Sequence, residues 1–274
     1  MLKNNTIMQK NIIELYTTNY NKGVKMHHIK RAIILAAGIG KRLQPLTLET
    51  PKPLITINGT CMIETIIQGL LFNGIQELYI VIGYLKEHFY YLKAKYPQIT
   101  FIENPFYDSC NNISSLYVAR EHLENAIILD GDQLIYNPSI LTASFERSGY
   151  NCIWTDTCTK EWLLTLEQGI VTHCSRDGGN RGWQLYSISH WTAEDGQKLR
   201  RHLEMEFIQN EQRQLYWDDV VLFCHRDEYE LGIFEMKPND VIEIDTLDEL
   251  IQLDNSYGGT LNERYTKGTG HENR

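Results

Sequence analysis

The chain has 274 residues, enough for one large domain or two small ones. Hydrophobic residues make up 42% of it and charged residues 22%, a composition typical of globular proteins. Its formal net charge is −9 and it has no long basic run, which argues against duplex DNA or an anionic membrane as a main partner. No apolar run approaches the roughly 18 residues of a membrane span, and no secretory signal pattern opens the chain. The six cysteines form no CxxC pair, which is typical of reduced thiols. We therefore expect a cytoplasmic protein.

Three regions of the chain differ in composition. Residues 1–29 are polar and rich in Asn and Lys, with an apolar patch at 12–16, and predict a short amphipathic helix or a loosely ordered arm without an assigned role. Residues 30–254 alternate apolar runs with amphipathic stretches and form the expected domain. Residues 255–274 are polar and Gly-rich, so we expect a disordered tail.

The first half of the domain, residues 30–150, alternates strands with helices. Short apolar runs predict buried strands at 31–37, 77–82, 100–103 and 126–130. Apolar residues at helical spacing predict helices at 62–71, 85–96 and 113–123. This alternation implies βαβ units and a mainly parallel sheet, whose ligands lie beyond the carboxyl ends of the strands.

The second half, residues 151–254, has more closely spaced strands and more aromatic residues. Strands are predicted at 152–155, 162–166, 170–174, 183–189 and 241–245. Helices are predicted at 199–208 and from 246 to about 253. This texture indicates a smaller antiparallel or mixed insertion after the parallel half.

The most informative segment is residues 35–54, in which LAAGIGKRLQPLT is followed by PKPL. A buried strand ends there in small residues, and Gly38 and Gly40 leave backbone N–H groups exposed that can cradle phosphates. Arg42 and Lys52 bring cations to the same loop, and both side chains are good partners for phosphate oxygens. The alternative is a structural glycine turn with solvated basic residues.

Two common phosphate-binding motifs are excluded. A dinucleotide-binding fingerprint requires glycine where this chain has Leu43. A P-loop requires GxxxxGK followed by Ser or Thr, and the chain has no such string.

Acidic residues follow two predicted strands. Asp130 and Asp132 flank a glycine at the end of strand 126–130, and Asp245 ends strand 241–245. Carboxylates at that edge of a sheet suit Mg²⁺, which prefers one or two carboxylates together with phosphate oxygens and water. The alternatives are a turn aspartate at Asp132 and a helix N-cap at Asp245.

Residues 31–54 resemble the signature of the nucleotidyltransferase superfamily that includes sugar-1-phosphate nucleotidylyltransferases. More narrowly, residues 30–254 resemble the bacterial choline-phosphate cytidylyltransferases. Beyond the glycine loop, the resemblance rests on four short strings in order: VIGYLKE at 81–87, NNxxSLY at 111–117, CTxEW at 158–162 and LYWD at 215–218.

The resemblance implies a Rossmann-like α/β fold of the nucleotide-diphospho-sugar transferase type. A mainly parallel, mixed sheet would have helices on both faces, with 30–150 as the nucleotide-binding half and the insertion in 151–254 as the acceptor-binding half. The implied activity is Mg²⁺-assisted in-line transfer of CMP from CTP to phosphocholine, giving CDP-choline and pyrophosphate.

The resemblance also implies roles for particular residues. Arg42 and Lys52 would be catalytic, and Asp132 and Asp245 would bind Mg²⁺ with Asp130 as a secondary ligand. The nucleotide would be bound by Leu35, Ala36, Ala37, Gly38, Gly40, Gly83, Tyr84, Asn112, Ser115 and Asp130. Asn112 also has a plain alternative as the N-cap of the helix predicted from 113.

The acceptor would be bound by Glu161, Trp162, Tyr186, Trp217 and Asp218. Aromatic faces hold quaternary ammonium groups and nearby carboxylates support them, which favours choline. For each tryptophan the alternative is an ordinary place in the core.

Three other readings stay open. The same chemistry on phosphoethanolamine, 2-aminoethylphosphonate or a sugar 1-phosphate would need a different acceptor pocket. A non-catalytic nucleotide sensor would show no turnover, and the joint presence of the cations and acids above argues against it. A nicotinamide dehydrogenase is disfavoured by Leu43. The sequence leaves the oligomeric state open.

Overall fold

The computed structural model describes residues 25–258. Within the arm predicted at 1–29, β1 (His27–His28) pairs with β9 (Ser144–Phe145), so the end of that arm joins the domain. Within the predicted tail, the Tyr257 hydroxyl donates to the Thr56 carbonyl at 2.6 Å. The expectation of disorder is therefore wrong for residues 255–258. Residues 1–24 and 259–274 lie outside the described residues.

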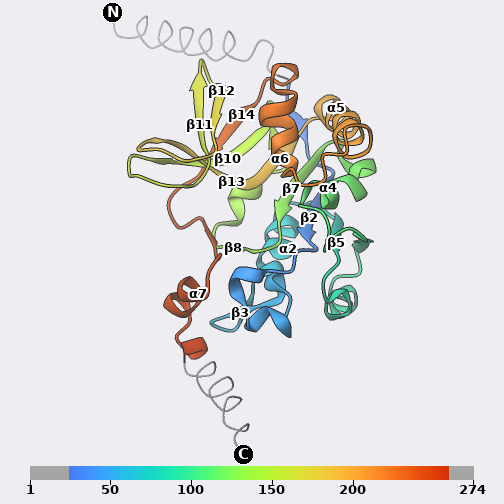
Figure 1. The fold of residues 1–274 in the computed structure, drawn as a ribbon, viewed down its shortest axis with the longest axis vertical. Coiled ribbons are helices and arrows are strands. Elements are labelled where there is room, and N and C mark those ends of the chain that lie inside the picture. The colour runs from blue at the N-terminus through green and yellow to red at the C-terminus, as the bar shows by residue number, and fades with distance from the viewer. Residues whose placement is uncertain (1–24, 259–274) are drawn as a thin grey trace, which may run out of the picture.

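A mixed sheet of nine strands forms the centre of the described chain (Figure 1). Its order is β12-β11-β13-β7-β2-β5-β6, and β10 pairs with both β13 and β14. The neighbouring parallel strands are β2 (Arg31–Ala36), β5 (Glu77–Ile82), β6 (Ile99–Glu103) and β7 (Ala126–Asp130). The other strands are β10 (Gly149–Thr155), β11 (Leu163–Glu167), β12 (Ile170–Ser175), β13 (Gly182–Trp191) and β14 (Gly232–Glu235). The predicted Rossmann-like α/β fold is confirmed.

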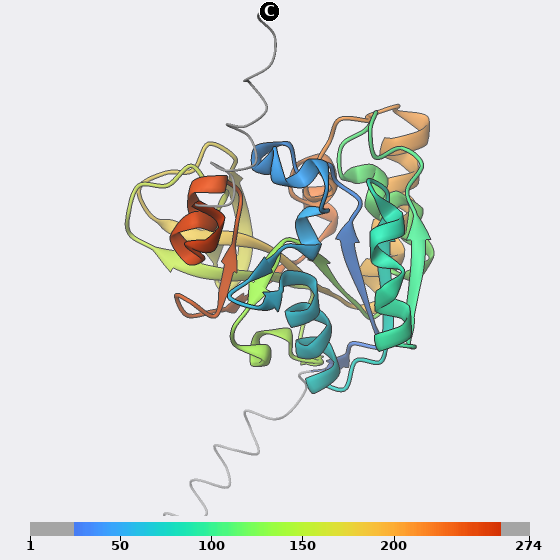
Figure 2. The ribbon, with the colours of Figure 1, turned by 90° about the horizontal axis from the view of Figure 1, so that it is seen from below.

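Helices cover both faces of the sheet (Figures 1 and 2), because alternate residues of each buried strand point to opposite sides. In β2, Ala32 and Ile34 pack in one core cluster with α2 (Met62–Phe72). Ile33 and Leu35 pack in a second cluster, to which α4 (Ile113–Val118) and α5 (Ala193–Glu204) contribute. The apolar run of this strand is thus buried from both sides, as the sequence predicts.

Three predicted helices differ in detail. The one at 85–96 is split into a 3₁₀ helix, η4 (Lys86–Phe89), and α3 (Tyr91–Lys95), and it follows Leu85 in the left-handed region at φ 47°. The one at 113–123 is α4 followed by the 3₁₀ helix η5 (Arg120–His122).

The helix predicted at 199–208 begins earlier, as α5, and continues as the π-helix η7 (Met205–Gln209). Thr192 is the N-cap residue of α5, because its side chain accepts a hydrogen bond from the Asp195 backbone N–H at 3.1 Å. The apolar spacing misses this start, since the first turn is polar. The following short elements are α6 (Trp217–Asp219), the π-helix η8 (Val220–Cys224) and the 3₁₀ helix η9 (Arg226–Glu228).

The antiparallel strands of the second half continue the sheet of the first half. β13 pairs antiparallel with β7, and β10 and β11 pair antiparallel with β13. The boundary expected after residue 150 therefore falls inside β10.

The last predicted strand leaves the main sheet. β15 (Val241–Glu243) pairs with β8 (Gln133–Ile135) and ends two residues before Asp245. α7 (Leu247–Leu253) follows, and its N-cap is Thr246, whose side chain accepts from the Glu249 N–H. The N-cap alternative for Asp245 is therefore wrong. Ile244 and Leu250 pack into a small third cluster with Leu43, which holds α7 near the glycine loop and the hairpin of β3 (Thr56–Ile57) and β4 (Thr60–Cys61).

Gly149 is expected to tolerate no side chain, because a Cβ there would lie 2.2 Å from the Gly232 carbonyl oxygen across the β10–β14 pair. We predict that Gly149→Ala lowers the free energy of unfolding by about 2–3 kcal/mol, the upper range for overpacking. Urea unfolding would show a lower midpoint at unchanged slope. Gly258→Ala, where the nearest atom would be 3.5 Å away, is the matched control. Equal midpoints for both variants would contradict the prediction.

Candidate active site

A pocket of about 520 Å³ opens at the carboxyl ends of β2 and β7, where an α/β sheet is expected to bind its ligand. It collects segments far apart in the sequence: the glycine loop, the start of α4 and the loop before it, Gln214 and Asp245. The predicted residues in its wall are Leu35, Ala36, Ala37, Gly38, Gly40, Arg42, Lys52, Asn112, Ser115, Asp130, Asp132 and Asp245.

The glycine loop is shaped by contacts behind it. Gly40 has φ 68°, a left-handed conformation that glycine adopts without strain, and its carbonyl accepts from the Thr47 hydroxyl at 2.9 Å. A Cβ on Gly40 would lie 3.1 Å from Thr47 and 3.2 Å from the Lys52 Cβ. A Cβ on Gly38 would meet nothing within 4 Å, so the backbone of Gly38 lies open beside the pocket. The loop therefore folds back on the 3₁₀ helix η3 (Lys52–Leu54) and carries Lys52 to the pocket.

Lys52 joins the two acidic segments. Its Nζ lies 2.6 Å from Asp132 Oδ2 and 3.0 Å from Asp245 Oδ1, although these residues are 80 and 193 positions away. Burial lowers the pKa of Lys52, but the two carboxylates outweigh burial, and the net pKa is raised. Lys52 is therefore a fixed positive charge at neutral pH.

Arg42 meets the same acid from the solvent side. Its guanidinium lies 2.7 Å from Asp245 Oδ1, and its side chain is 69% exposed. An exposed ion pair of this kind contributes little to stability. Arg42 is consequently free to exchange this partner for a ligand phosphate.

Three carboxylates form a candidate Mg²⁺ site. Asp132, Glu243 and Asp245 place one oxygen each within 4.8 Å of one another, and Asp132 Oδ1 is buried without a hydrogen-bond partner among the described residues. Burial raises the pKa of Glu243, and the charges of Asp132 and Asp245 raise it further. An all-oxygen set of this charge fits Mg²⁺.

Glu243 takes the place in this trio that the resemblance gives to Asp130. Asp130 still lines the pocket, but burial, followed by the charge of Asp132, raises its pKa to about 7. Glu243 alternates with Asp245 along 241–245, so the period-2 rule places both on one side. That signal was present in the sequence and points to Glu243 as well as Asp245.

A second pocket, of about 360 Å³, adjoins the first through Asp245, which lines both. Two predicted acceptor residues, Glu161 and Tyr186, lie in its wall. Glu243 and Glu249 line it too, so four carboxylates and one aromatic ring surround the space.

The chain is similar to several known proteins. The family model described as nucleotidyl transferase matches residues 31–162. The 2-aminoethylphosphonate cytidylyltransferase of Lancefieldella rimae is 37% identical over 229 residues, 82% of this chain and 92% of the relative. The choline-phosphate cytidylyltransferase of Streptococcus pneumoniae is 33% identical, over 82% of this chain and 96% of the relative.

This chain belongs to the nucleotidyl transferase family. A solved structure of CTP:phosphocholine cytidylyltransferase from Streptococcus pneumoniae superposes with a TM-score of 0.76 at 34% identity, covering 83% of this chain and 99% of that one. Among residues 25–258 of this nucleotidyltransferase, no helix combines the length and apolarity needed to cross a bilayer.

Three predicted acceptor residues of the nucleotidyltransferase line neither pocket. Trp217 is 1% exposed and stacks on Tyr150 in the second core cluster, so the core alternative holds for it. Asp218 is buried next to it, and burial raises its pKa well above the ordinary value. Trp162 packs edge-on against Tyr216, with ring centroids 5.9 Å apart. An aromatic cage built from Trp162 and Trp217 is therefore wrong.

Two predicted nucleotide residues also lie outside the pocket walls. Gly83 abuts the ring of Tyr107, since a Cβ on Gly83 would lie 2.8 Å from the Tyr107 Cβ. The Tyr84 N–H donates to the Ala37 carbonyl at 3.1 Å, which ties β5 to the glycine loop. Tyr107 lines the pocket in place of Gly83 and Tyr84, which the sequence predicts as nucleotide-binding residues.

Sequence reasoning missed several other wall residues of the nucleotidyltransferase. Asn104 directly follows β6, so the rule for strand ends points to it. Its amide donates to Ser114 and Ser115 at 3.0 Å each, which fixes the hydroxyls at the start of α4. No local pattern points to Gln214, because long-range hydrogen bonds hold it at the pocket: its amide donates to the Ser109 carbonyl at 2.9 Å, and its backbone carbonyl accepts from the Asn111 amide at 3.1 Å. The Asn112 Oδ1 accepts a hydrogen bond from the Trp217 backbone N–H at 2.9 Å, which holds the segment that carries Gln214 against the start of α4.

Proposed function

We propose that this nucleotidyltransferase transfers CMP from CTP to a small phosphonate or phosphate that carries an amine, with 2-aminoethylphosphonate the foremost acceptor. The observation that carries this is the junction of the two pockets, where Lys52 contacts both Asp132 and Asp245. A nucleotide in the larger pocket and an acceptor in the smaller one would meet at these three residues.

The larger pocket suits a nucleoside triphosphate. The open backbone at Gly38 and the cation of Arg42 bind the triphosphate, and Lys52 lies at its α-phosphate end. The amides and hydroxyls around the start of α4 pair with the polar edge of the base. Preference for cytosine is supported by the names of the relatives.

The smaller pocket suits a cationic amine. A primary ammonium donates hydrogen bonds that Glu161 and Glu249 can accept, whereas a trimethylammonium group has no N–H to donate and favours aromatic faces. One aromatic ring, Tyr186, lies in this wall, so the carboxylates favour the primary amine.

The reaction is an in-line displacement. An anionic oxygen of the acceptor forms a bond to the α-phosphorus of CTP, the bond from that phosphorus to the bridging oxygen breaks, and pyrophosphate leaves. Lys52 stabilises the charge on the reacting phosphate, and Arg42 holds the leaving phosphates. Asp132, Glu243 and Asp245 would hold Mg²⁺, which supplies charge neutralisation on the phosphate oxygens.

Phosphocholine is the second candidate acceptor. It is favoured by the relatives named choline-phosphate cytidylyltransferase and by the TM-score of 0.76 with the structure of the pneumococcal enzyme. In this case the Tyr186 ring would contact the trimethylammonium group.

Pyrophosphate release with CTP and Mg²⁺ tests the proposal. We expect kcat/KM for 2-aminoethylphosphonate to exceed that for phosphocholine by about tenfold or more, because a pocket of hydrogen-bond acceptors discriminates against a group without N–H donors. Phosphoethanolamine and glucose 1-phosphate serve as comparisons, and ATP, GTP and UTP replace CTP in parallel. Preference for phosphocholine would favour the second candidate, and release with none of the acceptors would favour a non-catalytic nucleotide sensor.

A further inference from the structure

Two histidines and two glutamates meet where α5 and η7 pack against η8 and η9. His202 and Glu206 are four residues apart on α5 and η7, whereas His225 lies between η8 and η9 and Glu228 ends η9. None of these four side chains lines either pocket. The nucleotidyltransferase activity therefore leaves this cluster without a role.

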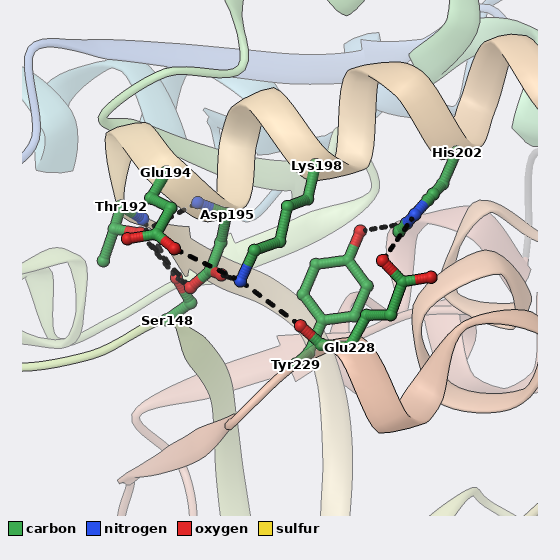
Figure 3. A network of polar contacts seen from close by, with 8 residues as sticks. All are labelled: Ser148, Thr192, Glu194, Asp195, Lys198, His202, Glu228 and Tyr229. Atoms are coloured by element: carbon green, nitrogen blue, oxygen red, sulfur yellow. Dashed lines mark hydrogen bonds and ion pairs between the residues drawn. The ribbon is translucent and has the colours of Figure 1, made fainter.

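The side chains converge on the Glu228 carboxylate. His202 Nε2 lies 3.2 Å from Glu228 Oε2, as Figure 3 shows, and His225 Nδ1 lies 3.6 Å from Glu228 Oε1. Ligand atoms of the three residues all lie within 4.8 Å of one another. Among residues 25–258, two groups of His, Cys, Asp and Glu bring three ligand atoms this close, and this is the one that contains histidine.

The other nitrogen of each histidine is already held by a partner. His202 Nδ1 lies 2.7 Å from the Tyr229 hydroxyl (Figure 3). His225 Nε2 lies 2.9 Å from Glu206 Oε1. Glu206 is itself buried and accepts from the Asn210 amide at 3.1 Å. With those outer nitrogens protonated, His202 Nε2 and His225 Nδ1 present their lone pairs toward Glu228. Histidines that bind metals are oriented in this way by an outer hydrogen bond.

We propose that His202, His225 and Glu228 bind a divalent transition-metal ion, with Zn²⁺ the best match. Two imidazole nitrogens and one carboxylate are common zinc ligands, and water can complete the shell. Mg²⁺ prefers oxygen ligands and suits the acidic trio instead, so the two sites select different ions.

The local charges suit this binding. The carboxylates of Glu206 and Glu228 face the histidines. The nearby cations are Arg201 and Lys198, whose Nζ lies 3.3 Å from the Glu228 carbonyl oxygen. The two rings stack with centroids 3.8 Å apart and planes at 6°, so binding one ion through both nitrogens requires the His225 ring to rotate out of the stack. The side chains of His225 and Glu228 are 13% and 56% exposed, which gives the ion a route from solvent.

A bound ion would fasten both ends of a segment that reaches the nucleotide pocket. Between Glu206 and His225 lies Gln214, whose amide donates to the Ser109 carbonyl in the pocket wall at 2.9 Å. The ion would thus have a structural role, outside the reacting centre.

Calorimetric titration of the full chain tests the proposal after treatment with a chelator. Zn²⁺ is added in the presence of excess Mg²⁺, which occupies the acidic trio. We expect one Zn²⁺ per chain and a rise of about 5 °C or more in Tm at 100 times the Kd, from the linkage between binding and stability. Co²⁺ in place of Zn²⁺ should give the visible absorption of a site with imidazole ligands. No uptake of Zn²⁺ above the Mg²⁺ background would overturn the proposal.

Variants separate this site from others. Glu228→Gln keeps the shape of an exposed side chain but removes its charge, and should weaken Zn²⁺ binding by at least about 10–100-fold. That is the loss of metal affinity on removing an outer hydrogen-bond partner, and losing a direct ligand should cost no less. Glu230→Gln, another exposed acid nearby, should bind Zn²⁺ as the unchanged protein does. His225→Gln should abolish the Co²⁺ absorption. Equal Zn²⁺ affinity in Glu228→Gln and Glu230→Gln, or an unchanged Co²⁺ spectrum in His225→Gln, would refute the assignment.

Discussion

Replacing Lys52 with methionine should lower kcat for nucleotidyl transfer by about 10²–10³-fold, the loss expected on removing one preorganised charge from a reacting centre. Methionine keeps most of the apolar stem but removes the cation that lies 2.6 Å from Asp132 and 3.0 Å from Asp245. The protein then supplies one positive charge fewer to the reacting phosphate. Steady-state kinetics with CTP and the preferred acceptor measure the change.

Lys30→Met is the matched control, because Lys30 is exposed and lies outside both pockets. It should leave kcat within a factor of about two, as surface substitutions usually have small effects. Urea unfolding of both variants shows whether the folded state persists. A folded Lys52→Met protein with near-normal kcat would remove Lys52 from the reaction.

Replacing Asp132 with asparagine should raise the Mg²⁺ concentration needed for half-maximal activity by at least about 10–100-fold, because the loss of a direct ligand exceeds that of an outer partner. Asparagine keeps the shape of the side chain but removes one negative charge from the trio with Glu243 and Asp245. The nearby Lys52 then has one carboxylate partner fewer. Activity measured across a Mg²⁺ titration gives the shift.

Asp156→Asn is the control for this variant, since Asp156 is exposed and outside the trio. An Asp132→Asn protein with the same Mg²⁺ dependence as Asp156→Asn would show that Asp132 is not a ligand. In that case Glu243 and Asp245 would hold the ion by themselves.

Local patterns predicted the parallel half of the fold well. The strand at 31–37 and the helix from residue 62 follow from unbroken apolar runs and from apolar spacing that ends at Asn73. The pattern failed where tight turns replace regular helix, as after Leu85 with its positive φ, and where a polar first turn begins a helix, as at Thr192. Backbone conformation and capping decide those places, and apolar spacing does not report on them.

The sequence by itself determined the phosphate loop and the acidic strand ends, because a glycine loop with Arg42 and Lys52, and the rule that ligands lie at strand ends, are local properties. Only the tertiary structure decided which distant groups meet. It brought Lys52 to Asp245 and added Glu243 to the acidic trio. It buried Trp217 in the core and left Tyr186 among carboxylates. The physical reason is that long-range packing fixes whether an aromatic or acidic side chain faces the core or a pocket, and no short string encodes that choice.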